Sequence, residues 1–251
     1  MGYEIRAMGM GEILDTAFRL VRNHAAQLIG ISLTLTVPTQ IFLEMIGNVT
    51  ADATATMIAG IIGFALFMIV VSPIVSAAIT HAISEVYLGR TVSYGGSLSV
   101  GLKLLMRLMG TAFLMILILI PAFALLVIPG LYLALAYMLV NQVIVIEGTA
   151  GWSALKRSYE LTKSNLLRVF GVYFVSMVLM MVVTMGLQLV ASQIPYASVI
   201  IASLTQGVMT TFMSAAFIVL YFDIRCRKEA FDLEHLAGQV GDAESQQAPA
   251  V

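Results

Sequence analysis

The chain has 251 residues, of which 60% are hydrophobic and only 11% charged, and its net charge at pH 7 is −1. Soluble globular chains carry roughly 45–50% apolar and about 25% charged residues, so this chain has too little charge to cover a soluble body of its size. The composition predicts an all-α protein that crosses a membrane several times. It excludes a nucleic-acid-binding domain, because the whole chain has only 13 Lys and Arg and no block of them is dense enough. The single cysteine, Cys226, excludes a disulfide framework and a Cys-rich metal site.

The N-terminal segment predicts a surface helix and no cleaved leader. The first 23 residues carry several charged side chains and lack the apolar core of a signal peptide. Within them, apolar side chains recur on one helical face at Ile13, Leu14, Ala17, Phe18 and Val21. Residues 8–23 therefore predict an amphipathic helix that lies on the inner face of the membrane.

Six stretches are long and apolar enough to cross a bilayer, since a spanning helix needs about 20 such residues. They cover residues 25–46, 56–78, 108–127, 129–146, 166–190 and 197–222, and the second continues as helix toward Tyr87. All Lys and Arg residues lie before the first span, after the sixth, or near the connections between spans two and three and between spans four and five. With six spans these segments share one side, and the positive-inside rule places both termini in the cytoplasm. We expect one membrane domain over residues 1–237 and a disordered tail over residues 238–251.

Residues 98–109 and 152–163 predict two further interfacial amphipathic helices, the second with Trp152 at headgroup depth. At a constant offset of 141 positions, residues 13–20 match residues 154–161, and Gly30 matches Gly171. The pattern indicates three repeats of an interfacial helix followed by a transmembrane hairpin. The alternative is that basic amphipathic helices resemble one another without being repeats.

Polar side chains inside the spans are few, and each is a candidate functional residue because burying it in lipid is costly. Glu44 lies near the outer end of the first span and Asn141 near the inner end of the fourth. Glu44 is close enough to the outer surface to be hydrated. An amide such as that of Asn141 more often bonds a neighbouring helix than a substrate.

The second span carries two polar stripes. Small polar residues recur every four positions, at Ser72, Ser76, Thr80 and Ser84, which is typical of a packing seam between helices. His81 and Glu85 lie one turn apart and could relay protons or supply two metal ligands. The alternative is that both are solvated at the cytoplasmic interface. No further ligand lies nearby and no catalytic or cofactor-binding motif is present, so we expect no metal, no cofactor and no enzymatic activity.

The segment after the sixth span is a charged helix. Asp223, Arg225 and Arg227 are candidate functional residues, because basic side chains at the membrane edge bind anionic headgroups. Arg225–Glu229 and Lys228–Asp232 are pairs of opposite charge at i,i+4 spacing. The alternative is a stop-transfer anchor that fixes the topology.

Both ends of the chain resemble one known family. Residues 11–18 (Gly-Glu-Ile-Leu-Asp-Thr-Ala-Phe) with Arg22-Asn23, and the ending Tyr221-Phe222-Asp223-Ile224-Arg225, resemble the membrane domain fused to some bacterial glycerophosphoryl diester phosphodiesterases and its stand-alone six-span relatives of unknown function. The resemblance implies an uncharacterised module of the bacterial inner membrane. That family's catalytic barrel is a separate soluble domain, so no catalytic residue carries over.

These patterns favour a non-enzymatic scaffold or lipid-interacting module. Its expected partners are membrane lipids, with anionic headgroups at the cytoplasmic face, and a partner protein; no nucleic acid is expected. A small-solute or lipid transporter is the alternative, since Pro38, Pro73 and Pro121 interrupt the first three spans. A membrane enzyme is the third hypothesis.

Overall fold

The computed structural model describes residues 6–47, 54–191 and 198–229, and all regular secondary structure in these ranges is helical. Before the fourth span the helices are α1 (Met10–Asn23), α2 (Ala25–Gly47), α3 (Thr54–Tyr87) and α4 (Tyr94–Leu125). The fourth span contains α5 (Val127–Ala136), α6 (Val140–Gln142) and the π-helix η2 (Val143–Glu147). The chain continues with α7 (Trp152–Thr162), α8 (Leu166–Ala191) and α9 (Ser198–Glu229). The predicted tail over residues 238–251, Asp232 of the predicted pair with Lys228, and the end of the predicted membrane domain all lie outside the described residues.

Six segments of the described chain are long and apolar enough to cross a membrane. They are Ala25–Met45, Ile58–Tyr87, Tyr94–Leu125, Val127–Glu147, Leu166–Leu189 and Val199–Glu229. Many large apolar side chains in them stay exposed, such as Phe113 at 62% and Val182 at 65%, where lipid would cover them. The prediction of an all-α, six-span membrane protein is confirmed.

Two of the three predicted interfacial segments are separate helices, and the third is not. α1 and α7 match the first and last. The prediction of a separate middle helix over residues 98–109 is wrong, because these residues form the first half of the single long helix α4. Nothing in the sequence between Gly101 and Gly110 breaks the helix, and the hydroxyl of Ser93 caps its start by accepting the N–H of Gly96 at 3.1 Å.

The two separate helices are packed against protein as well as exposed. In α1, Ile13, Ala17 and Leu20 are fully buried, whereas Phe18 of the predicted face is exposed. In α7 the buried face includes Leu155, Ser158 and Thr162, and Trp152 is 65% exposed. Trp152, which the sequence predicts at headgroup depth, therefore lies outside the packed face of α7.

The N-terminal and C-terminal helix groups correspond in position. α2 begins at Ala25 and α8 at Leu166, which is the offset of 141 positions seen in the sequence. The corresponding residues are buried in both groups, as in the pairs Ile13 and Ala154, Ala17 and Ser158, Leu20 and Leu161, Leu28 and Val169, and Ile31 and Val172. These matches agree with a repeat of α1–α3 in α7–α9. The threefold form of the repeat stays a prediction.

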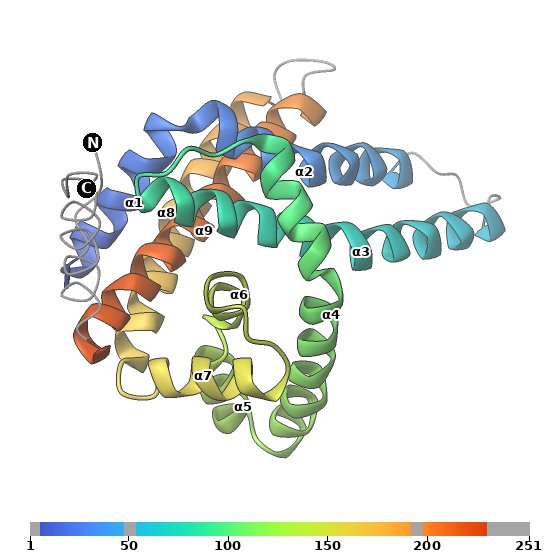
Figure 1. The fold of residues 1–251 in the computed structure, drawn as a ribbon. Coiled ribbons are helices and arrows are strands. Elements are labelled where there is room, and N and C mark those ends of the chain that lie inside the picture. The colour runs from blue at the N-terminus through green and yellow to red at the C-terminus, as the bar shows by residue number, and fades with distance from the viewer. Residues whose placement is uncertain (1–5, 48–53, 192–197, 230–251) are drawn as a thin grey trace, which may run out of the picture.

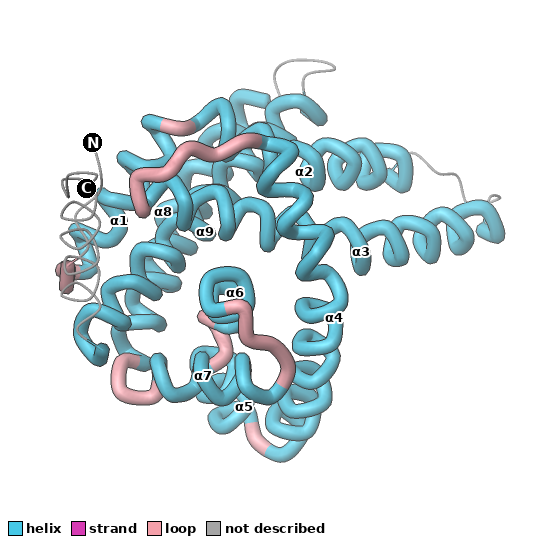
Figure 2. The backbone as a smooth tube through the Cα atoms, in the orientation of Figure 1, coloured by secondary structure: helices cyan, strands magenta, loops and turns pink. Residues whose placement is uncertain are grey.

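The helices are arranged in a cyclic manner around α6. α1 packs against α9, α7 packs against α4, α5 and α6, and the first half of α4 packs against α3, where the backbone of Gly101 meets the carbonyl of Ile74. The adjoining ends of α2 and α3, of α4 and α5, and of α8 and α9 lie at three different edges of the molecule (Figure 1). Figure 2 shows α6 near the middle of this arrangement, with loops on both of its sides.

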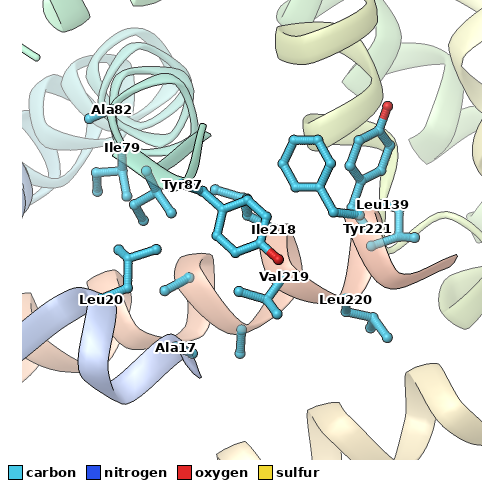
Figure 3. Close-up of a cluster of buried hydrophobic side chains, with 14 of the residues drawn as sticks. Ala17, Leu20, Ile79, Ala82, Tyr87, Leu139, Ile218, Val219, Leu220 and Tyr221 are labelled. Atoms are coloured by element: carbon cyan, nitrogen blue, oxygen red, sulfur yellow. The ribbon is translucent and has the colours of Figure 1, made fainter. Parts of the chain in front are cut away.

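The core lies where α1, α3 and α9 meet. Figure 3 shows Leu20 of α1, Ile79 of α3 and Ile218 of α9 among the buried side chains of this cluster. The ring of Tyr87 stacks on that of Phe222, with 5.2 Å between their centroids. Leu139, from the break in the fourth span, joins the same cluster. The core therefore connects the N-terminal helix to the fourth span.

Candidate functional site

Three of the predicted residues do not come together into a site. Glu44 is exposed on the last turns of α2. Glu85 pairs with Arg90, with 3.1 Å between its Oε1 and Nη1 of the arginine. The Nδ1 atom of His81 is buried without a hydrogen-bond partner among the described residues. His81 and Glu85 lie one turn apart on α3, no described interaction joins them, and a function for the pair stays a prediction. Within the described residues, no group of three or more His, Cys, Asp or Glu side chains is placed to hold a metal ion.

Asp223 is the centre of a buried ion-pair cluster. Its side chain is 1% exposed, and it accepts hydrogen bonds from Nε of Arg168 at 2.8 Å and from Nε of Arg227 at 3.2 Å. Asp223 also accepts the backbone N–H of Met8 at 2.7 Å. The carbonyl of Met8 accepts hydrogen bonds from both arginines. The cluster therefore holds the backbone just before α1 against α8 and α9.

A second cluster ties α7 to the fourth span and to the end of α9. Arg157 of α7 donates from Nε to Oε2 of Glu147 at 2.9 Å, and its Nη1 pairs with Glu229. Arg225 donates to the same Glu229 at 2.9 Å, which confirms the predicted i,i+4 pair, and Tyr221 donates its hydroxyl hydrogen to Glu147 at 2.7 Å. The hydrogen bond to Glu229 raises the pKa of Arg157, although burial opposes it.

Asp223, Arg225 and Arg227 have a structural role in these two clusters. Each charge has a partner of opposite sign within the protein. Burying an ion is costly unless it is paired and hydrogen-bonded, and the pairing meets that condition. Lys228 at the end of α9 donates from Nζ to the carbonyl of Glu160 on α7. The headgroup binding predicted for these residues is not tested by the pairing.

The fourth span is broken between α5 and α6. Residues 137–139 are in a turn, and the short helix α6 and then the π-helix η2 follow. The break frees the carbonyl of Ala136, which accepts the hydroxyls of Ser158 at 2.8 Å and Thr162 at 2.9 Å from α7. A buried backbone carbonyl left without a donor costs about 1–3 kcal/mol, so the hydroxyls of α7 stabilise the break. The three predicted proline interruptions, in contrast, lie inside the continuous helices α2, α3 and α4.

A cavity of about 400 Å³ lies beside this break. Its wall is formed by α3, α4 and the broken fourth span, and most of the side chains are apolar. The lining residues are Pro73, Ser76, Leu108, Thr111, Ala112, Met115, Leu119, Ala134, Tyr137, Met138, Val140, Asn141 and Ile144. Ligand pockets commonly have volumes of about 300–1,000 Å³ with a few polar groups in an apolar wall. The cavity has these properties.

Asn141 is the predicted residue that lies in the cavity. Its Nδ2 donates to Oγ of Ser76 at 3.2 Å and to Oγ1 of Thr80 at 2.8 Å. Thr80 is 1% exposed, and Ser76 lines the cavity. The small polar stripe of α3 is thus partly a seam against the fourth span, as predicted. At Ser76 it is also part of the cavity wall.

Sequence reasoning missed the break and the residues around it. Tyr137, Met138 and Leu139 include neither Gly nor Pro, the residues that usually mark a helix break. The signal that could have found it is on α7, where Ser158 and Thr162 place two hydroxyls one turn apart on the apolar side of an amphipathic helix. Met8, Glu147 and Arg157 were also missed, because their partners are remote in sequence.

The fold and the cavity define an integral membrane protein of six spans. The family described as a domain of unknown function (DUF7847) matches residues 55–224, and the chain belongs to this family. The match includes all the residues that line the cavity. No curated protein and no solved structure matches the chain.

Proposed function

We propose that this protein is a non-enzymatic membrane module that binds a lipid or lipid-like molecule in the cavity beside the broken fourth span. The observation that carries the proposal is the cavity itself. It is built entirely from spanning segments, and its wall is apolar apart from Ser76, Thr111, Tyr137 and Asn141. A molecule already dissolved in the bilayer can fill such a space without leaving an apolar environment.

The test compares lipids that copurify with the protein in native-lipid polymer discs. Ala112→Trp should fill the cavity, whereas Phe113→Trp changes a 62% exposed side chain on the next position of α4 and serves as the matched control. Mass spectrometry should find a lipid enriched over the bulk membrane in the wild type and in Phe113→Trp, and depleted in Ala112→Trp. A lipid profile equal to the bulk membrane in all three proteins would contradict the proposal.

We also propose that both termini face the cytoplasm of a bacterial inner membrane. The distribution of Lys and Arg supports this orientation. The contacts Arg168–Asp223, Arg157–Glu229 and Arg107–Gly148 support it too, since each joins segments expected on the same side. In a Cys226→Ser background, single cysteines at Asp52 and Ala191 should react with an impermeant thiol reagent in intact cells, and one at Ser99 should not. Labelling at Ser99 would contradict the orientation.

The resemblance of the two chain ends to a phosphodiesterase membrane domain supports a partner enzyme that acts on lipids. The exposed surface of α1, which carries Arg19 and Arg22, and Lys103 of α4 would face that enzyme or anionic headgroups at the cytoplasmic side. The same disc preparation tests this, because a stoichiometric copurifying protein should be present. Discs that contain lipid alone would remove the partner protein from the proposal and leave the lipid-binding module.

A transporter is the second candidate function, and the broken fourth span favours it. Discontinuous spanning helices line the substrate sites of many transporters. Against transport driven by an ion gradient, Glu44 is exposed at the end of α2 and does not line the cavity. Flux into proteoliposomes that collapses in Glu44→Gln would reverse the ranking.

A further inference from the structure

The polar groups of the cavity carry no formal charge. Among its lining residues none is Asp, Glu, Lys, Arg or His. The two ion-pair clusters described above do not line it, and their charges are paired with one another. A charged headgroup that entered this space would lose its hydration without finding a counter-charge, which costs several kcal/mol. A phospholipid would therefore keep its headgroup outside the cavity and bring only its acyl chains against the wall.

The residues that line the cavity have both hydrogen-bond donors and a hydrogen-bond acceptor that no described residue uses. Asn141 uses its Nδ2 on Ser76 and Thr80, and no described residue donates to its Oδ1. The hydroxyl of Ser76 accepts from Asn141, and no described residue takes its hydrogen. The hydroxyl of Tyr137 likewise makes no hydrogen bond with a described residue, although it interacts electrostatically with Tyr159 of α7. Each hydroxyl can donate one hydrogen bond, and the amide oxygen can accept up to two.

Thr111 is different from these three residues. Its hydroxyl donates to the carbonyl of Arg107 at 2.7 Å and accepts the N–H of Gly151 at 2.7 Å. Both of its strong hydrogen-bonding roles are filled by the backbone, so it has little capacity left for a ligand. The polar residues of the cavity wall that keep hydrogen-bonding capacity are therefore Ser76, Tyr137 and Asn141.

We infer that the cavity selects an uncharged glycerolipid with a free hydroxyl, of the diacylglycerol class, over phospholipids with the same acyl chains. This inference rests on the proposed lipid-binding function. The ligand's hydroxyl donates to Oδ1 of Asn141, and an ester carbonyl accepts from Ser76 or Tyr137. The acyl chains lie against the apolar wall and continue into the surrounding lipid. An uncharged headgroup also fits a polar site whose residues belong to spanning segments, as Ser76 does to Ile58–Tyr87 and Asn141 to Val127–Glu147.

The test uses photoactivatable diacylglycerol, phosphatidylcholine and phosphatidic acid with identical acyl chains, each diluted into proteoliposomes that contain the full chain. Crosslinked peptides from α4 and the fourth span report occupancy of the cavity. Diacylglycerol should label these peptides about fivefold to tenfold more than either phospholipid, the ratio that one or two net hydrogen bonds provide. Ser76→Ala and Asn141→Leu should reduce that ratio to within about twofold of unity.

Two variants keep the outcome interpretable. Ser72→Ala removes a hydroxyl from the same stripe of α3 outside the cavity and should keep the preference. Ser76→Ala leaves the Asn141–Thr80 hydrogen bond in place, so it should fold even if Asn141→Leu does not. Equal labelling by all three lipids that Ala112→Trp blocks would overturn the headgroup preference and leave the lipid-binding function standing. Absence of labelling by every lipid would contradict both.

Discussion

The end of α9 and the break in the fourth span both bury polar groups in a membrane protein, but they satisfy them in different ways. At the end of α9, Asp223 and Glu229 each bind two arginines, so the charges are neutralised inside the protein. At the break, hydroxyls of α7 satisfy the freed carbonyl of Ala136, and the amide of Asn141 keeps an unused acceptor in the cavity.

This difference in how buried polar groups are satisfied distinguishes residues that stabilise the fold from residues that remain available to a ligand. Charged residues are the usual first choice as functional sites in a membrane, because burying them is costly. In this protein the buried charges are paired, and spare hydrogen-bonding capacity is left on uncharged groups. The comparison predicts that substitutions at the end of α9 mainly change stability, whereas substitutions in the cavity mainly change ligand binding.

Asp223→Ala should have the largest effect on stability. It leaves Arg168 and the backbone of Met8 without their acceptor in a buried place, which costs about 3–5 kcal/mol of unfolding free energy. Asp15→Ala is the control, because its partner Arg19 is exposed and such pairs contribute less than about 1 kcal/mol. Unfolding in mixed micelles measures both. An equal, small loss in the two variants would contradict the structural role of the cluster.

Gly101→Ala should be destabilising by about 2–3 kcal/mol, because the added methyl group meets the backbone carbonyl of Ile74 and pushes α4 away from α3. Gly110→Ala on the same helix has open space around it and should gain up to about 1 kcal/mol from helix propensity. The same unfolding measurement compares the two. Since α3 and α4 both form the cavity wall, Gly101→Ala should also weaken lipid labelling. Intact labelling would show that the cavity tolerates this displacement.

The double substitution Ser158→Ala with Thr162→Val should cost about 1–2 kcal/mol, because it removes both donors from the carbonyl of Ala136. Ser153→Ala on the exposed side of α7 is the control and should be close to neutral. Hydrogen exchange should accelerate at residues 137–140 in the double variant alone. Unchanged exchange there would mean that α7 does not stabilise the break.

The spans were predictable because apolar length identifies a transmembrane helix almost independently of its neighbours. The separate helices α1 and α7 were predictable for a related reason, since the amphipathic pattern is local. The continuity of α4 was not predictable from the sequence. Its side chains change from an amphipathic pattern to an apolar one, but such a change does not interrupt the helical backbone. The break at Tyr137 depends on hydroxyls from α7, which are more than 20 positions away in the sequence.

The candidate site was predicted in part for the same reason. Asn141 stands out in an apolar span, and the structure places it in the cavity with Ser76. The ion pairs of Asp223 and Arg225 were predictable only where they are local, as for Arg225 and Glu229. The contacts of Asp223 with Arg168 and Met8 span 55 and 215 positions of the chain, and no pattern in one sequence reveals such a pairing.

The smallest expected effect concerns a charge that neither buried region uses. Glu12 accepts the N–H of Gly9 at 2.6 Å and pairs with Arg6 at 2.9 Å, and these contacts lower the pKa of its carboxyl below the ordinary 4.5. A lowered pKa means that its contribution to stability is complete above about pH 4.5 and is lost as the pH falls through the lower folded-state value. The melting temperature of the wild type should therefore lie slightly above that of Glu12→Gln at pH 7, and the difference should shrink as the pH falls below 4.5. A difference that stays the same as the pH falls would mean that the side chain stabilises α1 by packing and not by its charge.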